Sequence, residues 1–116
     1  MKKTKMLKKN YQFRKVLSKG KFFKENEVEI FLLKNNTKNN FLGIAVSTKN
    51  GKAFQRNRAK RLIRESFFRL ETQITEGNSI VVLIKKETDL KNIDFIRIYE
   101  SMKSCFKKAK ILKEEE

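Results

Sequence analysis

Hydrophobic and polar residues alternate in two short segments in the first half of the chain. In residues 28–33, the aliphatic residues at even positions share one face of an extended strand, and the other face carries Glu29, Phe31 and Leu33. Residues 41–47 alternate in the same way, but the residues between the aliphatic ones are small: Gly43, Ala45 and Ser47. An Asn-rich turn separates the segments, so we predict two antiparallel strands joined by a loop. The small face leaves room either for a packed helix or for a ligand.

Apolar residues at three- and four-residue spacing predict three helices. The first is a short helix that Gly20 would end in a left-handed cap. The second begins between residues 53 and 57 and ends near residue 74, and the third covers about residues 90–110, with Asp89 as its cap. The apolar faces of these helices are formed by Phe13, Val16 and Leu17, by Ala59, Leu62, Ile63, Ser66, Phe67, Leu70 and Ile74, and by Phe95, Tyr99, Met102, Phe106 and Ala109.

Residues 79–84 are nearly all apolar and do not alternate. This pattern is typical of a central strand that is covered on both faces and runs parallel to its predecessor, so residues 41–84 predict a βαβ unit. The predicted order is therefore α-β-β-α-β-α, an α+β two-layer sandwich with a small mixed sheet. We expect the 116 residues to form a single domain, with residues 1–9 too charged to pack and residues 111–116 mobile as well.

Composition excludes several classes of function. The chain has no His and a single Cys, Cys105, so it offers no Ser-His-Asp triad, no Cys-His pair, no internal disulfide and no His- or Cys-based metal site. Paired carboxylates and Gly-rich phosphate loops are also missing from the sequence, so we predict no catalytic residue, no bound metal and no small-molecule substrate. The longest apolar run, residues 80–84, is too short to cross a bilayer, and we expect a cytoplasmic protein without a membrane partner.

The positive charge is concentrated in two segments. The chain has 29 Lys and Arg against 13 Asp and Glu, a net charge of +16. Residues 1–24 contain ten basic residues and residues 49–64 contain seven, and neither segment has an acidic residue. Blocks of one sign repel each other unless an anion binds, so this segregation indicates a polyanionic partner rather than a merely solvated surface.

The basic residues of the second segment fall on one side of the predicted second helix. At about 100° per residue, Asn57, Arg61 and Arg64 lie opposite the apolar face, Arg58 and Lys60 flank them, and Arg56 can reach outward from the helix start. Arg can grip two phosphate oxygens at once, and the first amides of a helix add positive potential. Asn57 can bind a sugar hydroxyl or a base edge, or it can serve only as a cap. The sequence therefore predicts a basic ridge that suits a polyphosphate partner.

Aromatic residues predict a second element of the site. Phe31 lies on the more polar face of its strand and, with Phe13 and the small sheet face, could line an uncharged aromatic groove with basic edges. Such a groove suits unpaired nucleotides, because the bases stack while the phosphates find cations. Phe68 also lies beside arginines and could stack a base, but we expect the N-terminal segment to cover it.

Residues 51–65 resemble the signature of the bacterial ribonuclease P protein subunit. The segment reads Gly-Lys-Ala-Phe-Gln-Arg-Asn-Arg-Ala-Lys-Arg-Leu-Ile-Arg-Glu, with the family's Arg-Asn-Arg core, Lys-Arg pair, apolar pair and following Arg. Residues 42–47 are similar to the strand that leads into that signature, and Phe13, Val16 and Gly20 fit the family's first helix. Met6, Leu17 and Thr48 depart from the family pattern.

The resemblance implies a subunit of an endoribonuclease that removes the 5′ leader from precursor tRNA. The protein would bind the catalytic RNA and the leader, whereas the RNA would hold the catalytic centre and use Mg²⁺. Phe13, Leu17 and Phe31 would line the leader groove. The RNA-binding residues would be Lys49, Lys52, Arg56, Asn57, Arg58, Lys60, Arg61 and Arg64. The resemblance also implies a left-handed βαβ connection, which is rare among proteins.

Two other functions fit parts of the sequence. A structural RNA-binding protein, such as a ribosomal protein, would have the same charge blocks. A DNA-binding basic region is disfavoured, because it would need leucine heptads after residue 64, where Gly77 and a strand follow instead.

Overall fold

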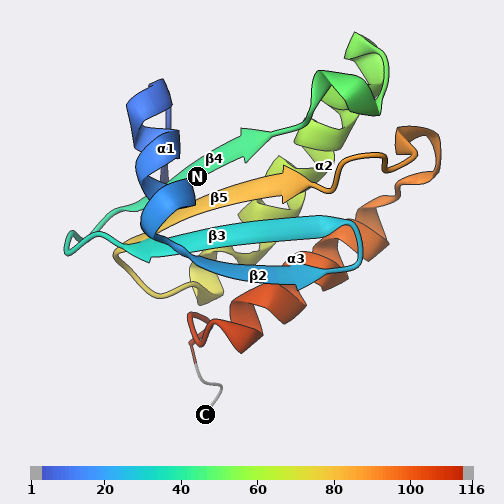
Figure 1. The fold of residues 1–116 in the computed structure, drawn as a ribbon. Coiled ribbons are helices and arrows are strands. Elements are labelled where there is room, and N and C mark those ends of the chain that lie inside the picture. The colour runs from blue at the N-terminus through green and yellow to red at the C-terminus, as the bar shows by residue number, and fades with distance from the viewer. Residues whose placement is uncertain (1–3, 114–116) are drawn as a thin grey trace.

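A mixed sheet of five strands forms the centre of the computed structural model, which describes residues 4–113 (Figure 1). The strands lie in the order β1-β4-β5-β3-β2. They are β1 (Thr4–Met6), β2 (Lys21–Glu25), β3 (Val28–Lys34), β4 (Asn40–Ala45) and β5 (Asn78–Ile84). The helices are α1 (Asn10–Lys19), α2 (Ala53–Leu70) and α3 (Phe95–Lys108), with short 3₁₀ turns η1 (Thr48–Asn50), η2 (Glu71–Gln73) and η3 (Leu90–Asn92).

Helices α2 and α3 cover one face of the sheet, and α1 lies across one end of the other face (Figure 1). The predicted α+β class and the parallel β4-α2-β5 unit are confirmed. In Figure 1, α2 passes behind the sheet between two strands that both point to the right, with β4 above β5, so the connection is left-handed. The resemblance had implied this rare hand.

The predicted pairing of β3 with β4 is wrong. Strand β5 lies between them, antiparallel to β3 and parallel to β4. Because β5 is apolar on both faces, it takes the central position, and the strands that carry small or charged residues on their second face, such as Gly43 of β4 and Glu29 of β3, flank it. The hairpin partner of β3 is β2, which the sequence analysis missed. Asn26 turns the chain between them with a φ of 52°, a conformation that Asn tolerates well.

Residues near both ends of the chain pack, contrary to the expectation that residues 1–9 and 111–116 stay outside the fold. Strand β1 runs parallel to β4, and the buried Leu7 donates its amide to the carbonyl of Leu42. The unpaired backbone groups at the β4 edge of the sheet can form hydrogen bonds with such a strand, and the side chain of Lys5 stays exposed. Ile111 is also fully buried. Residues 1–3 and 114–116 lie outside the described residues.

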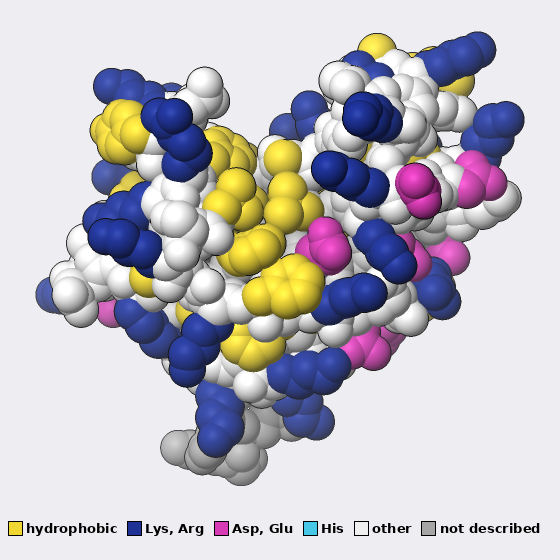
Figure 2. All heavy atoms as spheres, in the orientation of Figure 1, with side chains coloured by type: hydrophobic (Ala, Val, Ile, Leu, Met, Phe, Trp, Pro, Cys, Tyr) yellow, Lys and Arg dark blue, Asp and Glu magenta, His cyan; other side chains and the backbone are white. Residues whose placement is uncertain are grey.

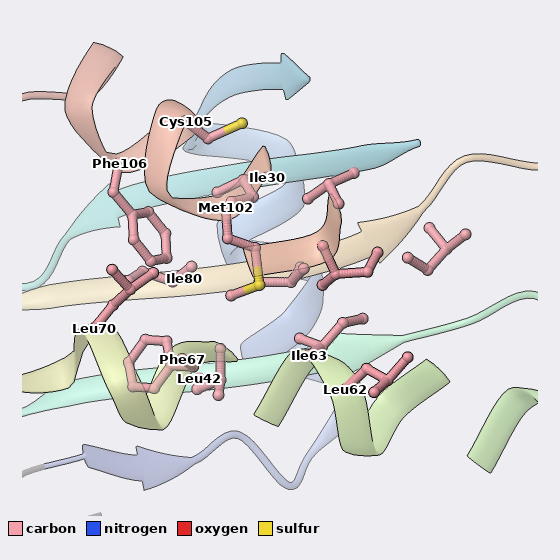
Figure 3. Packing of buried hydrophobic residues seen from close by; sticks show 14 of the residues in the cluster. Ile30, Leu42, Leu62, Ile63, Phe67, Leu70, Ile80, Met102, Cys105 and Phe106 are labelled. Carbon is pink, nitrogen blue, oxygen red and sulfur yellow. The ribbon is translucent and has the colours of Figure 1, made fainter. Parts of the chain in front are cut away.

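The main core lies between the sheet and helices α2 and α3. Every residue of the predicted inward face of the second helix is buried, from Ala59 to Ile74. In Figure 3, Phe67 and Leu70 of α2 and Met102 and Phe106 of α3 lie over Ile30, Leu42 and Ile80 of the sheet. Cys105 is buried in this core, and burial raises the pKa of its thiol to about 11, so the thiol stays protonated at neutral pH.

Ion pairs hold the β2–β3 hairpin against α3. Arg97 Nε lies 2.9 Å from the carboxylate of Glu27, and Lys108 pairs with Glu25. The hydrogen bond from Lys108, together with its charge, lowers the pKa of the Glu25 carboxyl below its ordinary value. The contribution of this pair to stability is therefore present above the unfolded-state pKa of the carboxyl and is lost as the pH falls through the folded-state value.

Gly20 joins α1 to β2 where there is no room for a side chain. Its φ is −76°, so the predicted left-handed cap is wrong. Glycine is required because a Cβ would lie 2.5 Å from the carbonyl oxygen of Val16 and 3.0 Å from that of Leu32. We expect Gly20→Ala to lower the free energy of unfolding by about 1–3 kcal/mol, because both neighbours are backbone atoms. Urea denaturation measures this change.

Ser18→Ala, on the exposed side of the same helix, is the control and should unfold within about 0.5 kcal/mol of wild type. An unchanged urea midpoint for Gly20→Ala would contradict the close approach of α1 and β3.

Candidate nucleic-acid interface

The basic residues of α2 divide into two groups according to their contacts. Arg56 Nη1 donates to the carbonyl of Gly51 over 2.6 Å, and Arg58 Nη1 donates to the carbonyl of Ile93 over 2.9 Å. These two side chains fasten the start of α2 to the turn before it and to the segment before α3. Within residues 4–113, no side-chain hydrogen bond or ion pair engages the remaining ridge residues, which are Asn57, Lys60, Arg61 and Arg64. These four are free to bind a ligand.

The different contacts of Arg56 and Arg61 predict different effects of their replacement. Arg56 is half-buried and bound to a backbone carbonyl, so we expect Arg56→Ala to lower the free energy of unfolding by about 0.5–1.5 kcal/mol. Arg61 is exposed, and Arg61→Ala should stay within about 0.5 kcal/mol of wild type. Urea denaturation of both variants checks this. Equal stabilities would show that the Arg56 contact does not hold the helix start.

An open groove runs along the outer face of α2. It has a volume of about 620 Å³ and is lined by Arg61, Arg64, Glu65, Phe68 and Arg69. We call it the α2 groove. Phe68 is 60% exposed, so the expectation that the N-terminal segment covers it is wrong. The reason is that residues 4–7 pair with β4 at the edge of the sheet instead.

A second surface lies on the sheet face opposite to α2 and α3. Figure 2 shows this face hollowed between α1 and the loops beyond β4 and β5, with hydrophobic side chains gathered on its floor and Lys and Arg around it. We call this hollow the trough. Strand register and ring contacts place on its floor Phe13, Phe22, Phe31, Ala45 and Leu83.

The small residues of β4 serve two purposes in the trough. The ring of Phe13 lies against Gly43, where an added Cβ would be 2.6 Å from Phe13 Cε1. Gly43 therefore makes room for helix α1. Ala45 lies further along the strand and remains half-exposed. The small face of β4 was expected to make room either for a packed helix or for a ligand. It packs against a helix at Gly43 and is open at Ala45.

The structure places two of the three predicted groove residues together. Phe13 and Phe31 are half-buried and pack in the same apolar cluster beneath α1. Leu17 is 37% exposed and lies outside this cluster, on the outer surface of α1 beside Arg14 and Ser18. Leu17 therefore does not join Phe13 and Phe31 on the trough floor.

Sequence reasoning missed Phe22 on the trough floor and left the charge of Glu29 out of the predicted groove. The ring of Phe22 is half-exposed, and its centroid lies 5.0 Å from that of Phe31. A turn-favouring Asn26 after Lys-Phe-Phe-Lys was the available signal for this strand. Glu29 is half-buried on the same face and pairs in register with Lys24, so the floor is not uncharged as predicted.

Basic side chains stand at the rim where β4 and β5 end. Lys49 in η1 and Lys52 before α2 are exposed. The buried Asn50 fixes this turn: its Nδ2 donates to the carbonyl of Lys85 over 3.1 Å, and its Oδ1 accepts from the amide of Glu87 over 2.9 Å. Because β4 and β5 are parallel, their carboxyl ends meet at one edge, and Lys49 and Lys85 stand on the same rim.

A separate cavity of about 340 Å³ lies on the other flank of α1. Tyr11 and Lys15 of α1 line it together with Lys34 and Asn36 near the end of β3. The predicted groove residues Phe13, Leu17 and Phe31 do not line this cavity, so we keep it distinct from the trough. Among residues 4–113, no cluster of His, Cys, Asp or Glu could hold a metal ion, and no helix is long and apolar enough to cross a membrane.

A cationic helix face beside an aromatic trough on an α+β fold is typical of RNA-binding proteins. Comparison with known proteins gives the family. The family model described as Ribonuclease P matches residues 1–110. The ribonuclease P protein component of Listeria monocytogenes serovar 1/2a is 38% identical over 115 residues, covering 98% of this chain and 95% of the relative. That of Clostridium kluyveri is 38% identical over 110 residues, covering 92% and 96%.

Solved structures agree with this family. The RNase P protein of Staphylococcus aureus has a TM-score of 0.81 at 29% identity, covering 92% of this chain and 96% of that chain. The Thermotoga maritima protein has a TM-score of 0.80 at 30% identity, covering 90% and 96%. The chain therefore belongs to the ribonuclease P protein family, as a subunit of this tRNA-processing endoribonuclease and a partner of ribonuclease P RNA.

Proposed function

We propose that the trough binds the single-stranded 5′ leader of precursor tRNA while the outer face of α2 binds the RNA subunit. The observation that carries this proposal is the pair of rings on the trough floor, Phe22 and Phe31, whose centroids lie 5.0 Å apart and of which Phe22 is 49% exposed. Exposed rings on a sheet surface can stack only with bases that are not already stacked in a duplex. The trough therefore suits an unpaired strand.

The rim of the trough supplies the charge that such a strand needs. Lys49 and Lys85 stand where β4 and β5 end, and Lys24 lies beside the floor on β2. Lys offers a flexible point charge, which suits phosphates of a strand that has no fixed geometry. Contacts to phosphates and stacking on rings do not depend on which base is present, so such a site binds strands of many sequences. A protein that acts on different precursors requires this tolerance of sequence.

The outer face of α2 has the chemistry for a folded RNA. Arg61 and Arg64 are exposed, and their guanidinium groups can bind phosphate oxygens in pairs. The amides at the start of α2 add positive potential near Lys52 and Asn57. Because Arg56 and Arg58 are anchored to protein carbonyls, they keep this helix start rigid and still contribute their charge.

In this proposal the RNA subunit holds the Mg²⁺ that hydrolysis requires. The residues of this chain bind and orient the substrate strand, and their positive charge lowers the repulsion between leader and RNA subunit. The family members compared above come from bacteria, and we place the protein in the cytoplasm, where tRNA precursors are made.

Reconstituted cleavage tests the proposed function. The purified protein is added to its RNA subunit, and the cleavage rate of a precursor tRNA is measured as Mg²⁺ is lowered. We expect the protein to maintain cleavage at Mg²⁺ concentrations at which the RNA subunit alone has lost it, because the protein supplies part of the counter-charge. No rescue, together with tighter binding to ribosomal RNA fragments than to precursor tRNA, would favour a structural RNA-binding protein instead.

A further inference from the structure

Phe68 is a large apolar side chain that the fold does not need. It is 60% exposed on the outer face of α2, whereas its neighbour Phe67 is fully buried and packs edge-on against Phe106. Within residues 4–113, the ring of Phe68 joins none of the aromatic or cation–π pairs that the structure contains. A polar residue would serve an exposed helix position equally well.

The surroundings of Phe68 carry the charge of a nucleic-acid site. Phe68 follows Arg61 by seven residues and Arg64 by four, so all three lie along one stripe of α2. The α2 groove that they line holds three guanidinium groups and one carboxylate, that of Glu65. Arg69 on its edge lies over the ring of Phe95 of α3, 4.9 Å from its centroid, which fixes that wall of the groove.

We infer that the α2 groove is a stacking site for an unpaired base of the RNA subunit, with Phe68 as the platform and Arg61 and Arg64 on the adjoining phosphates. This inference rests on the proposed function and extends it from phosphate binding to base binding, in the half of α2 beyond the Arg-Asn-Arg core. Two facts favour RNA over a protein partner: the positive charge of the groove and its continuity with the ridge. We specify an unpaired base because the faces of a base within a duplex are covered by the neighbouring base pairs.

Three substitutions at one position separate stacking from simple apolar contact. Phe68→Ala removes the ring, Phe68→Leu keeps apolar surface without a π face, and Phe68→Tyr keeps the face. The probe is the full-length RNA subunit transcribed from the gene of the same organism, with affinity measured by filter binding. We expect Phe68→Ala and Phe68→Leu to bind about 5- to 100-fold more weakly and Phe68→Tyr to bind within about twofold of wild type.

Two further readouts belong to the same experiment. Stacking neutralises no phosphate, so the slope of log affinity against log salt should not change in any Phe68 variant. Chemical probing of the RNA should reveal one unpaired base that wild type and Phe68→Tyr protect and Phe68→Ala leaves open. Ile96→Ala, which removes a side chain 71% exposed on α3, is the control and should bind as wild type does. Urea midpoints verify that every variant folds.

Several results would overturn the stacking site. One is wild-type affinity for Phe68→Ala, and another is equal affinity for Phe68→Leu and Phe68→Tyr. A changed sedimentation coefficient of free Phe68→Ala, at unchanged RNA affinity, would show that the groove contacts protein instead. Measuring Arg61→Ala in the same assay distinguishes a failure of the stacking site from a failure of the proposed role of α2. If Arg61→Ala loses affinity while Phe68→Ala does not, only the stacking site is wrong, and if neither loses affinity, the proposed role of α2 is wrong as well.

Discussion

Replacing Arg61 and Arg64 together by Ala is expected to weaken binding of the RNA subunit by about 100-fold. Each guanidinium that binds a phosphate contributes about 1.5–3 kcal/mol, and two such losses at the lower end of this range give that factor. The slope of log affinity against log salt should also become shallower, by about 1.4 to 1.8, since two phosphates are no longer neutralised. Because both side chains are exposed and unpaired among the described residues, the urea midpoint should stay near that of wild type.

A matched control separates the position of the charge from its amount. Lys107→Ala combined with Lys110→Ala removes the same net charge from two exposed positions, one in the last turn of α3 and one just after it, that belong neither to the ridge nor to the α2 groove. This control should weaken binding by no more than a few fold, through the general field alone. If the control loses as much affinity as the arginine variant, the net charge of the protein matters and the ridge does not.

Removing the exposed ring on the trough floor is expected to weaken binding of precursor tRNA to the assembled enzyme. Phe22→Ala should lower the affinity for a precursor with a long leader by about 5- to 100-fold, because base–aromatic stacking contributes about 1–3 kcal/mol per base. Phe22 is 49% exposed, so this variant retains most of the packing of the sheet. Phe31→Ala should act in the same direction and should also cost stability, because its ring is half-buried.

Leader length provides the control for this second experiment. A precursor whose leader is a single nucleotide cannot reach across the floor, so wild type and Phe22→Ala should bind it equally. An equal loss for long and short leaders would place Phe22 in contact with the tRNA body or the RNA subunit, and the trough would not be the leader site.

The sequence was sufficient where one helix carries a long regular pattern. The seven inward residues from Ala59 to Ile74 repeat at three- and four-residue spacing through α2 and the turn that follows it, and all of them are buried. The same pattern placed Arg61 and Arg64 on the outside, where the structure has them. What it could not provide are the contacts of Arg56 and Arg58, because these depend on where the turn at Gly51 and the segment at Ile93 come to lie in three dimensions.

Strand order was harder to predict than strand position. The alternation in β3 and β4 gave the correct faces, but both strands could satisfy their hydrogen bonds with each other or with β5. The deciding feature is that β5 is apolar on both faces. Such a strand takes the centre of the sheet, which places β5 between β3 and β4. Strand β1 has three residues, too few for any periodicity, and its position is set by the open edge of β4. The missed β2 explains why Phe22 was missing from the predicted groove.

The chemistry of the single cysteine makes one direct measurement possible. Cys105 is buried, and the pKa of its thiol is raised to about 11, so it should not react with thiol reagents while the protein is folded. A cysteine introduced by Ala45→Cys on the trough floor, or by Glu65→Cys in the α2 groove, can therefore carry a photoreactive probe by itself. Each labelled protein is assembled with its RNA subunit and a precursor tRNA and then irradiated.

The identity of the cross-linked RNA shows which surface contacts which partner. We expect the probe at position 45 to attach to the 5′ leader and the probe at position 65 to attach to the RNA subunit. Attachment of the position 45 probe to the RNA subunit, with the leader reacting only at position 65 or at neither position, would contradict the assignment of the trough to the leader and of α2 to the RNA subunit.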